Sequence, residues 1–299
     1  MAGTVNANES TAHPMTPSPA SFLRLRQICL VAQDLEPTVD TLCEVLGLHV
    51  CHRDAGVERF GLHNALMRIG SSFIEVVAPL PGPRGQNTAA TRHLARLGGD
   101  GGYMVILDAD AIAPWRTHAA ALGIREASFH QVAGYTGLQL HPRDTGGTLL
   151  EINHSEGNGK LNGPYWPAGP HWQDAPDSAV CVALQGATVS GVDANRLSQR
   201  WAALLQRQAV PSSATGIGTL SQSPHRLLLD NAAALAFRSV PAHENQGLTG
   251  LQVAVRDWAG LLKRASALGL PNQISDAAAS VVICGVTWQL KLVPPVVVP

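Results

Sequence analysis

The chain contains two copies of one stretch of sequence, and this repeat constrains its fold more than any other feature. The copies are 76 positions apart, and they agree where a strand ends, where a helix ends and where a final strand carries an acid, with no gap needed. The matched positions are Asp34 with Asp110, Leu46-Gly47 with Leu122-Gly123, and Glu75 with Glu151. A period of this length exceeds that of most solenoid repeats and predicts a duplicated domain half.

Each copy reads as one strand, one helix and three further strands. In the first copy, the alternation in 26–35 predicts a strand that sends Gln27, Cys29 and Val31 to one face. A helix should follow, with Pro37 in its first turn and Gly47 as its C-cap. Three short apolar stretches then complete a βαβββ unit.

The motifs in these stretches resemble those of the vicinal oxygen chelate superfamily, which includes glyoxalase I, methylmalonyl-CoA epimerase and extradiol dioxygenases. The similarity lies in QICLVAQDL, FIEVVAP and HPRDTGGTLLEI, and it covers residues 22–155. It implies paired βαβββ modules whose sheets curl around a cleft. In enzymatic members that cleft holds a divalent metal ion.

Two fainter copies follow in the second half, so we expect an α+β protein of four βαβββ modules that form two glyoxalase-like domains with curled mixed sheets. In these copies the polar cleft positions are lost. Gly250 takes the place of Gln27, Leu290 that of Glu75, and Phe237 or Ala236 the acidic position of the third module. The second half is therefore expected to be degenerate.

The expected organisation has four parts. A disordered leader spans 1–21, a domain bearing the cleft spans 22–155, a linker spans 156–177, and the degenerate domain spans 178–295. The linker is rich in Gly and Pro yet carries Tyr165, Trp166, His171 and Trp172. Such aromatics either pin a linker to a surface by burying area or form a lid over the cleft.

By resemblance, the metal ligands come from the first and last strands of each module. The corresponding positions are Gln27, Glu75, Tyr103 and Glu151. Two carboxylates and an amide oxygen suit a hard or borderline divalent ion. Tyr103 departs from the family pattern because a neutral phenol is a poor ligand. We therefore place it, with His63 and His141 as possible substitutes for the missing imidazole, among the residues that line the cleft.

Two functions are open at this point. The chain is either a metal-dependent isomerase or lyase, with Glu151 as the base that moves a proton beside a carbonyl, or a metal-free protein that binds or sequesters a small molecule. Alternatively, one or both acids are structural, and Arg26, Arg53, Arg68 or Arg143 compensates the buried negative charge. Two buried acids need some such compensation.

Composition excludes several other classes. Charged residues make up 14% of the chain and the net charge is -1, which is unlike a nucleic-acid-binding protein. No apolar run is long enough to cross a membrane, and the N-terminus lacks the basic and apolar regions of a secretory signal. We expect a cytoplasmic protein, monomeric or homodimeric, whose partner is a small molecule.

Overall fold

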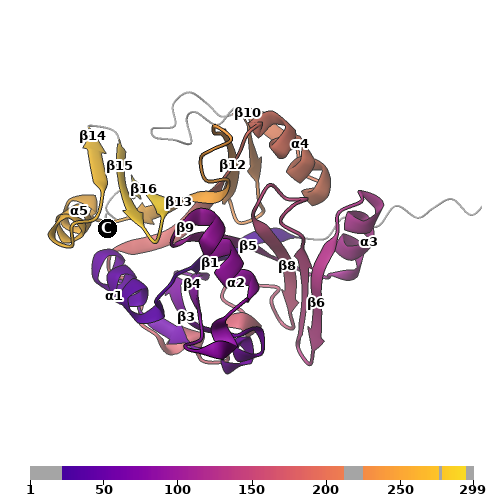
Figure 1. Cartoon of the computed structure of the whole chain (residues 1–299), viewed down its shortest axis with the longest axis horizontal. Coiled ribbons are helices and arrows are strands. Elements are labelled where there is room, and N and C mark those ends of the chain that lie inside the picture. Colours follow the sequence, from indigo (N-terminus) through magenta and orange to yellow (C-terminus); the bar gives the residue numbers. More distant parts are fainter. Residues whose placement is uncertain (1–21, 212–224, 276–277, 294–299) are drawn as a thin grey trace, which may run out of the picture.

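Figure 1 shows the computed structural model of the chain, which describes residues 22–211, 225–275 and 278–293. Two eight-stranded mixed sheets dominate it, one from each half of the chain. This confirms the predicted fold class, α+β, with four βαβββ modules arranged as two domains with mixed sheets. The expected leader, 1–21, lies outside the described residues.

The first sheet has the strand order β2-β3-β4-β1-β5-β8-β7-β6. Its strands are β1 Leu23–Val31, β2 Val50–His52, β3 Leu62–Ile69, β4 Ser72–Pro79, β5 Gly101–Ala109, β6 Glu126–Val132, β7 Tyr135–Leu140 and β8 Leu149–Ser155. Within each module the first and last strands pair in parallel, as β1 with β4 and β5 with β8. The modules join through the antiparallel pair β1 and β5.

Helices α1 (Leu35–Leu46) and α3 (Ala113–Ala121) occupy the same place in the two modules. The apolar side of α1 is buried with alternate residues of β1 and β4, among them Ile28, Leu30 and Ile74. Gly47 ends α1 with a left-handed backbone, φ 63°, as the sequence predicts. We call the helix-covered side of the sheet its outer face and the opposite side its inner face.

The remaining helical elements of the first half lie within the first module, between the two modules and along the linker. They are α2 Ala89–Leu97, and the 3-10 turns η1 Ala55–Phe60, η2 Pro83–Gly85, η3 Trp166–Ala168 and η4 Trp172–Asp174. Thr88 is the N-cap of α2, and its hydroxyl accepts from the Thr91 backbone N–H.

The second sheet repeats the topology with the order β10-β11-β12-β9-β13-β16-β15-β14. Its elements are β9 Cys181–Gly191, α4 Ala194–Leu205, β10 Ala209–Pro211, β11 His225–Leu228, β12 Ala234–Ser239, β13 Gly247–Val255, α5 Trp258–Ala267, β14 Asn272–Ser275, β15 Ala278–Ile283 and β16 Val286–Leu292. None of the helices in the described part of the chain has the length and apolar character that a membrane span requires.

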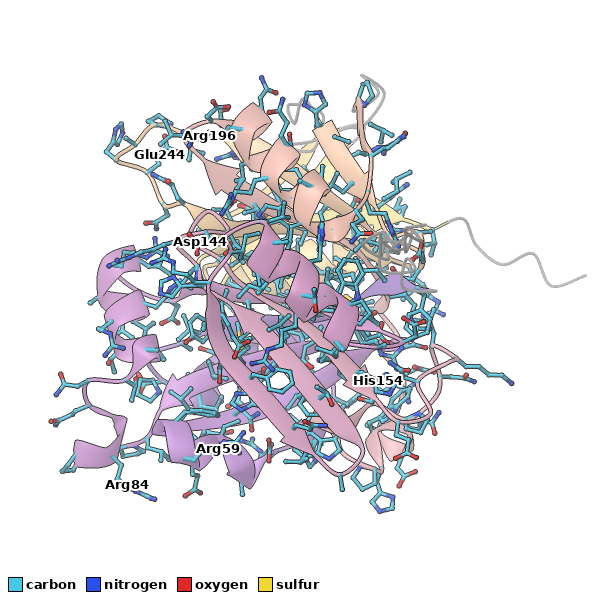
Figure 2. The ribbon with its side chains drawn as sticks, turned by 90° about the vertical axis from the view of Figure 1, so that its right-hand side faces the viewer. Arg59, Arg84, Asp144, His154, Arg196 and Glu244 are labelled. Atoms are coloured by element: carbon cyan, nitrogen blue, oxygen red, sulfur yellow. The ribbon has the colours of Figure 1, made fainter. Side chains whose placement is uncertain are left out.

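The two halves share one hydrophobic core and pack tightly. A Cβ on Gly102 would lie 2.1 Å from the carbonyl oxygen of Leu248, so a larger residue there would push the halves apart. The indole of Trp201 donates to the carbonyl of Thr145 at 3.1 Å. Figure 2 shows Asp144 at this junction, where its carbonyl accepts from Arg200.

Candidate functional site

The inner face of the first sheet brings Gln27 and Glu75 into direct contact. Gln27 Nε2 donates to Glu75 Oε2 at 2.8 Å, and Asn64 Nδ2 donates to Glu75 Oε1 at 2.6 Å. These side chains meet because β3, β4 and β1 are neighbours and each sends alternate residues to this face. Glu75 is only 8% exposed.

Glu151 is held in a similar way by neutral donors from the second module. Tyr135 Oη donates to Oε1 at 2.8 Å, Asn153 Nδ2 to the same oxygen at 2.9 Å, and Gln139 Nε2 to Oε2 at 2.9 Å. Neither these partners nor Asn64 were predicted from the sequence. Their signal is a polar residue at an alternate position of an otherwise apolar strand.

The two acids lie close enough for their charges to interact. Burial raises the pKa of Glu75, and the charge of Glu151 adds to that rise, whereas the hydrogen bond from Asn64 opposes it. Beside them, the thiol of Cys29 is fully buried, and burial together with Glu75 raises the pKa of Cys29 well above its usual value. The inner face therefore favours protonation of Glu75.

Replacing Glu75 by glutamine should make folding less sensitive to pH. A carboxyl whose pKa is raised by folding is most stabilising when protonated, so its contribution falls as pH rises from its unfolded pKa of about 4.3 through the raised folded value. In Glu75→Gln, Oε1 can accept from Asn64 and Nε2 can donate to Gln27 Oε1, which is buried and has no partner among the described residues. Urea unfolding between pH 4 and 8 should show the variant gaining on the wild type as pH rises. Exposed Glu244→Gln is the control, and a constant difference would contradict the prediction.

Two β-bulges change the correspondence between the modules. On β1, Leu25 pairs with Leu107 and Gln27 with Ile106, which leaves Arg26 as an extra residue. On β5, Tyr103 is the extra residue, because Met104 pairs with Cys29 and Gly102 with Leu30. A bulge turns two successive side chains toward one side.

The strand register identifies Met104, rather than Tyr103, as the counterpart of Gln27. Gln27 pairs with Phe73, two residues before Glu75, and Met104 pairs with Leu149, two residues before Glu151. The repeat therefore needs a one-residue gap at the first strand. Tyr103 packs beside His93 with ring centroids 5.0 Å apart, and burial raises its pKa to about 12.

The two histidines expected to line the cleft do not lie beside the acids. His63 is on the face of β3 opposite Asn64, where its charge acts on Glu36 at the start of α1. His141 is in the turn after β7, and its Nδ1 accepts from the Arg143 backbone N–H at 3.2 Å. Strand alternation decides the position of His63, and the end of β7 decides that of His141.

A different histidine, His130 on β6, lies near Glu151. The charge of Glu151 acts on its imidazole, although burial is the larger effect and lowers the pKa of His130. Its ring also contacts Phe60 of η1, with centroids 5.7 Å apart. Since η1 follows the edge strand β2 and β6 is the opposite edge strand, this contact shows that the sheet curls far enough for a turn near one edge to touch the other edge.

The ends of the curled sheet are closed by two segments. At one end, Ala90 and Leu94 of α2 pack on Val31, Val77 and Met104. At the other end the linker covers the sheet, with Tyr165 stacked on Phe73 at 5.0 Å and Trp172 set edge-on to it at 5.2 Å. The prediction that linker aromatics pin it to a surface therefore describes Tyr165 and Trp172.

Two buried arginines lie beneath the linker. Arg24 Nε and Nη2 donate to the Asp108 carboxylate at 3.0 and 2.6 Å, and Asp108 is fully buried. Arg26 is 1% exposed, with Tyr165 and Trp172 within 5.8 Å of its guanidinium carbon. Burial lowers the pKa of Arg26, and Asp108 opposes this.

None of the arginines proposed to compensate the acids does so. Arg53 pairs with Glu36 at 2.8 Å, Arg68 with Asp177, and the hydrogen-bond partners of Glu75 and Glu151 are neutral amides and a phenol. The two acids are compensated, as a structural role would require, but by these neutral donors and not by the predicted arginines.

The donor set fits a resident divalent metal ion poorly. Gln27 turns its amide N–H, not its oxygen, toward Glu75, and the fourth position carries the thioether of Met104. The carboxylate oxygens that a metal would need already accept from this chain's own side chains. Across the described residues, no three His, Cys, Asp or Glu side chains gather in a metal-binding arrangement.

In the second half, the corresponding inner-face positions are neutral. Gln252 pairs with Gln289 as Cys29 pairs with Glu75, so Gln289 and not Leu290 takes the place of Glu75. Leu290 belongs to the core with α5, since the tight turn before β16 is shifted by one residue relative to the sequence alignment. Phe237 contacts Trp201 of α4, which leaves Ala236 at the acidic position of the third module.

Comparison with known proteins agrees with this architecture. The profile of the family described as "Glyoxalase-like domain" matches residues 28–205, which is more than half of the chain. The chain belongs to the glyoxalase-like domain family. It is thereby a member of the vicinal oxygen chelate superfamily, as the repeat and motifs indicated.

Solved structures extend the likeness of this glyoxalase-like protein to nearly its whole length. A 4-hydroxymandelate synthase variant from Streptomyces coelicolor has a TM-score of 0.65 at 12% identity, covering 92% of this chain and 93% of its own. A hypothetical protein from Staphylococcus aureus has a TM-score of 0.58 at 11% identity, covering 91% and 100%. At these identities the likeness concerns the fold.

Smaller proteins match one half. A methylmalonyl-CoA epimerase from Streptomyces coelicolor, in complex with 2-nitronate-propionyl-CoA, has a TM-score of 0.40 at 21% identity, covering 46% of this chain and 99% of its own. A search of curated proteins finds no match.

Proposed function

We propose that this glyoxalase-like protein binds a small, partly apolar molecule on the inner face of its first sheet, without a resident metal ion. The observation that carries the proposal is the set of neutral donors on both acids. Asn64 and Gln27 donate to Glu75, and Tyr135, Gln139 and Asn153 donate to Glu151. The acids are thus compensated by the protein itself.

The buried acceptors without partners and the apolar side chains on this face indicate what kind of ligand would bind. Gln27 Oε1 and Asn153 Oδ1 are buried acceptors with no hydrogen-bond partner among the described residues. Buried acceptors of this kind are costly unless a donor reaches them. Cys29, Met104 and Ile106 supply apolar surface on the same face. A ligand with an amine, amide or hydroxyl donor and an apolar body matches both features.

Catalysis stays the alternative. In such a reaction Glu151 would be the base that takes a proton beside a carbonyl, and protonated Glu75 would donate to the carbonyl oxygen. The raised pKa of Glu75 supports that pairing. The metal-assisted form of the reaction has less support, because the donor set described above suits a metal poorly.

Thermal unfolding with added metals and fragments tests the proposal. A metal with a dissociation constant of about 1 µM, added at 1 mM, stabilises a folded protein by about 4.1 kcal/mol. We expect Mg²⁺, Mn²⁺, Ni²⁺ and Zn²⁺ to shift the midpoint by less than about 1 °C, well below that effect. Metal analysis of protein purified without chelators should agree.

A library of small fragments with and without hydrogen-bond donors completes the experiment. Fragments that carry donors should raise the midpoint of the wild type and of Glu244→Gln, and the effect should be lost in Glu151→Gln. Stoichiometric metal, or fragment binding that ignores both Glu75→Gln and Glu151→Gln, would overturn the proposal.

A further inference from the structure

A groove lies outside the inner face, on the exposed side of the linker. Its volume is about 640 Å³, and it lies between the two edges of the first sheet. Figure 2 labels His154, at the end of β8 where the linker begins. The groove is lined in part by His52, Asp54, Glu156, Tyr165, Trp166 and Trp172. Neither Glu75 nor Glu151 lines it, so we call it the linker groove and treat it separately.

One wall of the linker groove is a fixed, exposed aromatic face. Trp166 is 44% exposed, yet its indole stacks on Tyr135 with centroids 4.8 Å apart and planes 22° from parallel. Its backbone N–H also donates to Ser155 Oγ at 2.9 Å. Trp166 is therefore held in one orientation with a ring surface open to the groove. An exposed aromatic ring that is held in one orientation offers a ready contact surface for a ligand.

The charges of the groove have one sign. Its lining includes the carboxylates of Asp54 and Glu156, and no lysine or arginine. Among the described residues, neither carboxylate forms an ion pair. Asp54 accepts from the Gly56 backbone N–H, whereas Glu156 is exposed and its Oε2 lies 3.9 Å from where a Cβ on Gly134 would stand. The charged side chains in the lining therefore favour a cation over an anion.

We propose that the linker groove binds an organic cation, such as a quaternary or primary ammonium compound. Ammonium groups bind aromatic faces through cation–π attraction, and flanking carboxylates add Coulomb attraction. An exposed indole that lines the same groove as two carboxylates without ion-pair partners supplies both. The inference goes beyond the binding function proposed for the inner face and does not depend on it.

Calorimetry with choline, and with its uncharged isostere 3,3-dimethylbutan-1-ol, tests this directly. Choline should bind saturably and the isostere much more weakly, because only the positive charge distinguishes them. Trp166→Ala and the isosteric Glu156→Gln should each weaken choline binding by about 3- to 30-fold, the range expected for a cation–π contact or a partly desolvated charge. Both residues are exposed, so folding should be preserved.

Glu244→Gln is the matched control. Glu244 is exposed and lies in the second half, in the upper part of Figure 2, away from the linker. This variant should bind choline like the wild type. Equal binding of the neutral isostere, no saturable binding of choline, or unchanged affinity in both groove variants would overturn the inference. Glu151→Gln should leave choline binding intact, which separates this result from failure of the inner-face proposal.

Discussion

Replacing Asp108 by asparagine is expected to destabilise the protein by about 3–5 kcal/mol, the cost of breaking a buried ion pair from one side. Asp108 is fully buried and accepts two hydrogen bonds from Arg24, which is 6% exposed. Its charge also acts on buried Arg26. Without the carboxylate, two guanidinium groups would be left beneath the linker with no opposite charge. Urea unfolding monitored by circular dichroism measures the loss.

Two controls separate this effect from ordinary truncation. The double variant Arg24→Met with Asp108→Leu removes both charges and should recover most of the stability, since an apolar pair replaces the ion pair. Glu126→Gln breaks the exposed pair with Arg116 and should cost no more than about 1 kcal/mol. If Asp108→Asn costs as little as Glu126→Gln, the buried pair does not matter for stability.

The Asp108→Asn variant should also have a more mobile linker. Arg24 Nη2 also donates to the carbonyl of Asn158 at 2.6 Å, so the ion pair orients a group that holds the start of the linker. Limited proteolysis should therefore cut Asp108→Asn within 156–177 faster than it cuts the wild type.

Much of the fold could be predicted because its signals are local and repeated. Helix ends are marked by Gly47 and Gly123, and the alternation in 26–35 marks the strand before the first helix. The two acids were found for the same reason: Glu75 and Glu151 are single charged residues in otherwise apolar strands. Their contacts with amide side chains depend on which strands pair, which no local pattern states.

The errors trace to one-residue shifts in register. Tyr103 was matched to Gln27 because a bulge adds one residue to each central strand at a different place. Leu290 was matched to Glu75 because the β15–β16 turn is Cys284-Gly285, whereas the β3–β4 turn is Gly70-Ser71. A shift of one residue exchanges the faces of a strand, so even a correct fold gives the wrong site residue.

The register makes a strong prediction about metal binding. Replacing Met104 by histidine should raise the affinity for Ni²⁺ or Zn²⁺ by about a hundredfold or more, which corresponds to about 2.8 kcal/mol. Met104 is the counterpart of Gln27, whose side chain reaches the acid two positions along the neighbouring strand. An imidazole there would join Gln27, Glu75 and Glu151 as the ligand that zinc and nickel prefer. Isothermal titration of wild type and variant with each metal measures the gain.

Tyr103→His is the matched control, since the 76-residue repeat would place the new imidazole there instead. Tyr103 lies beside His93, so any metal gained by this variant would sit with His93 and would not depend on Glu151. The affinity gained by Met104→His, in contrast, should be lost when Glu75→Gln or Glu151→Gln is added. The opposite result would be that only Tyr103→His gains metal affinity and that adding Glu151→Gln removes it. Tyr103, and not Met104, would then be the counterpart of Gln27, as the ungapped repeat predicts.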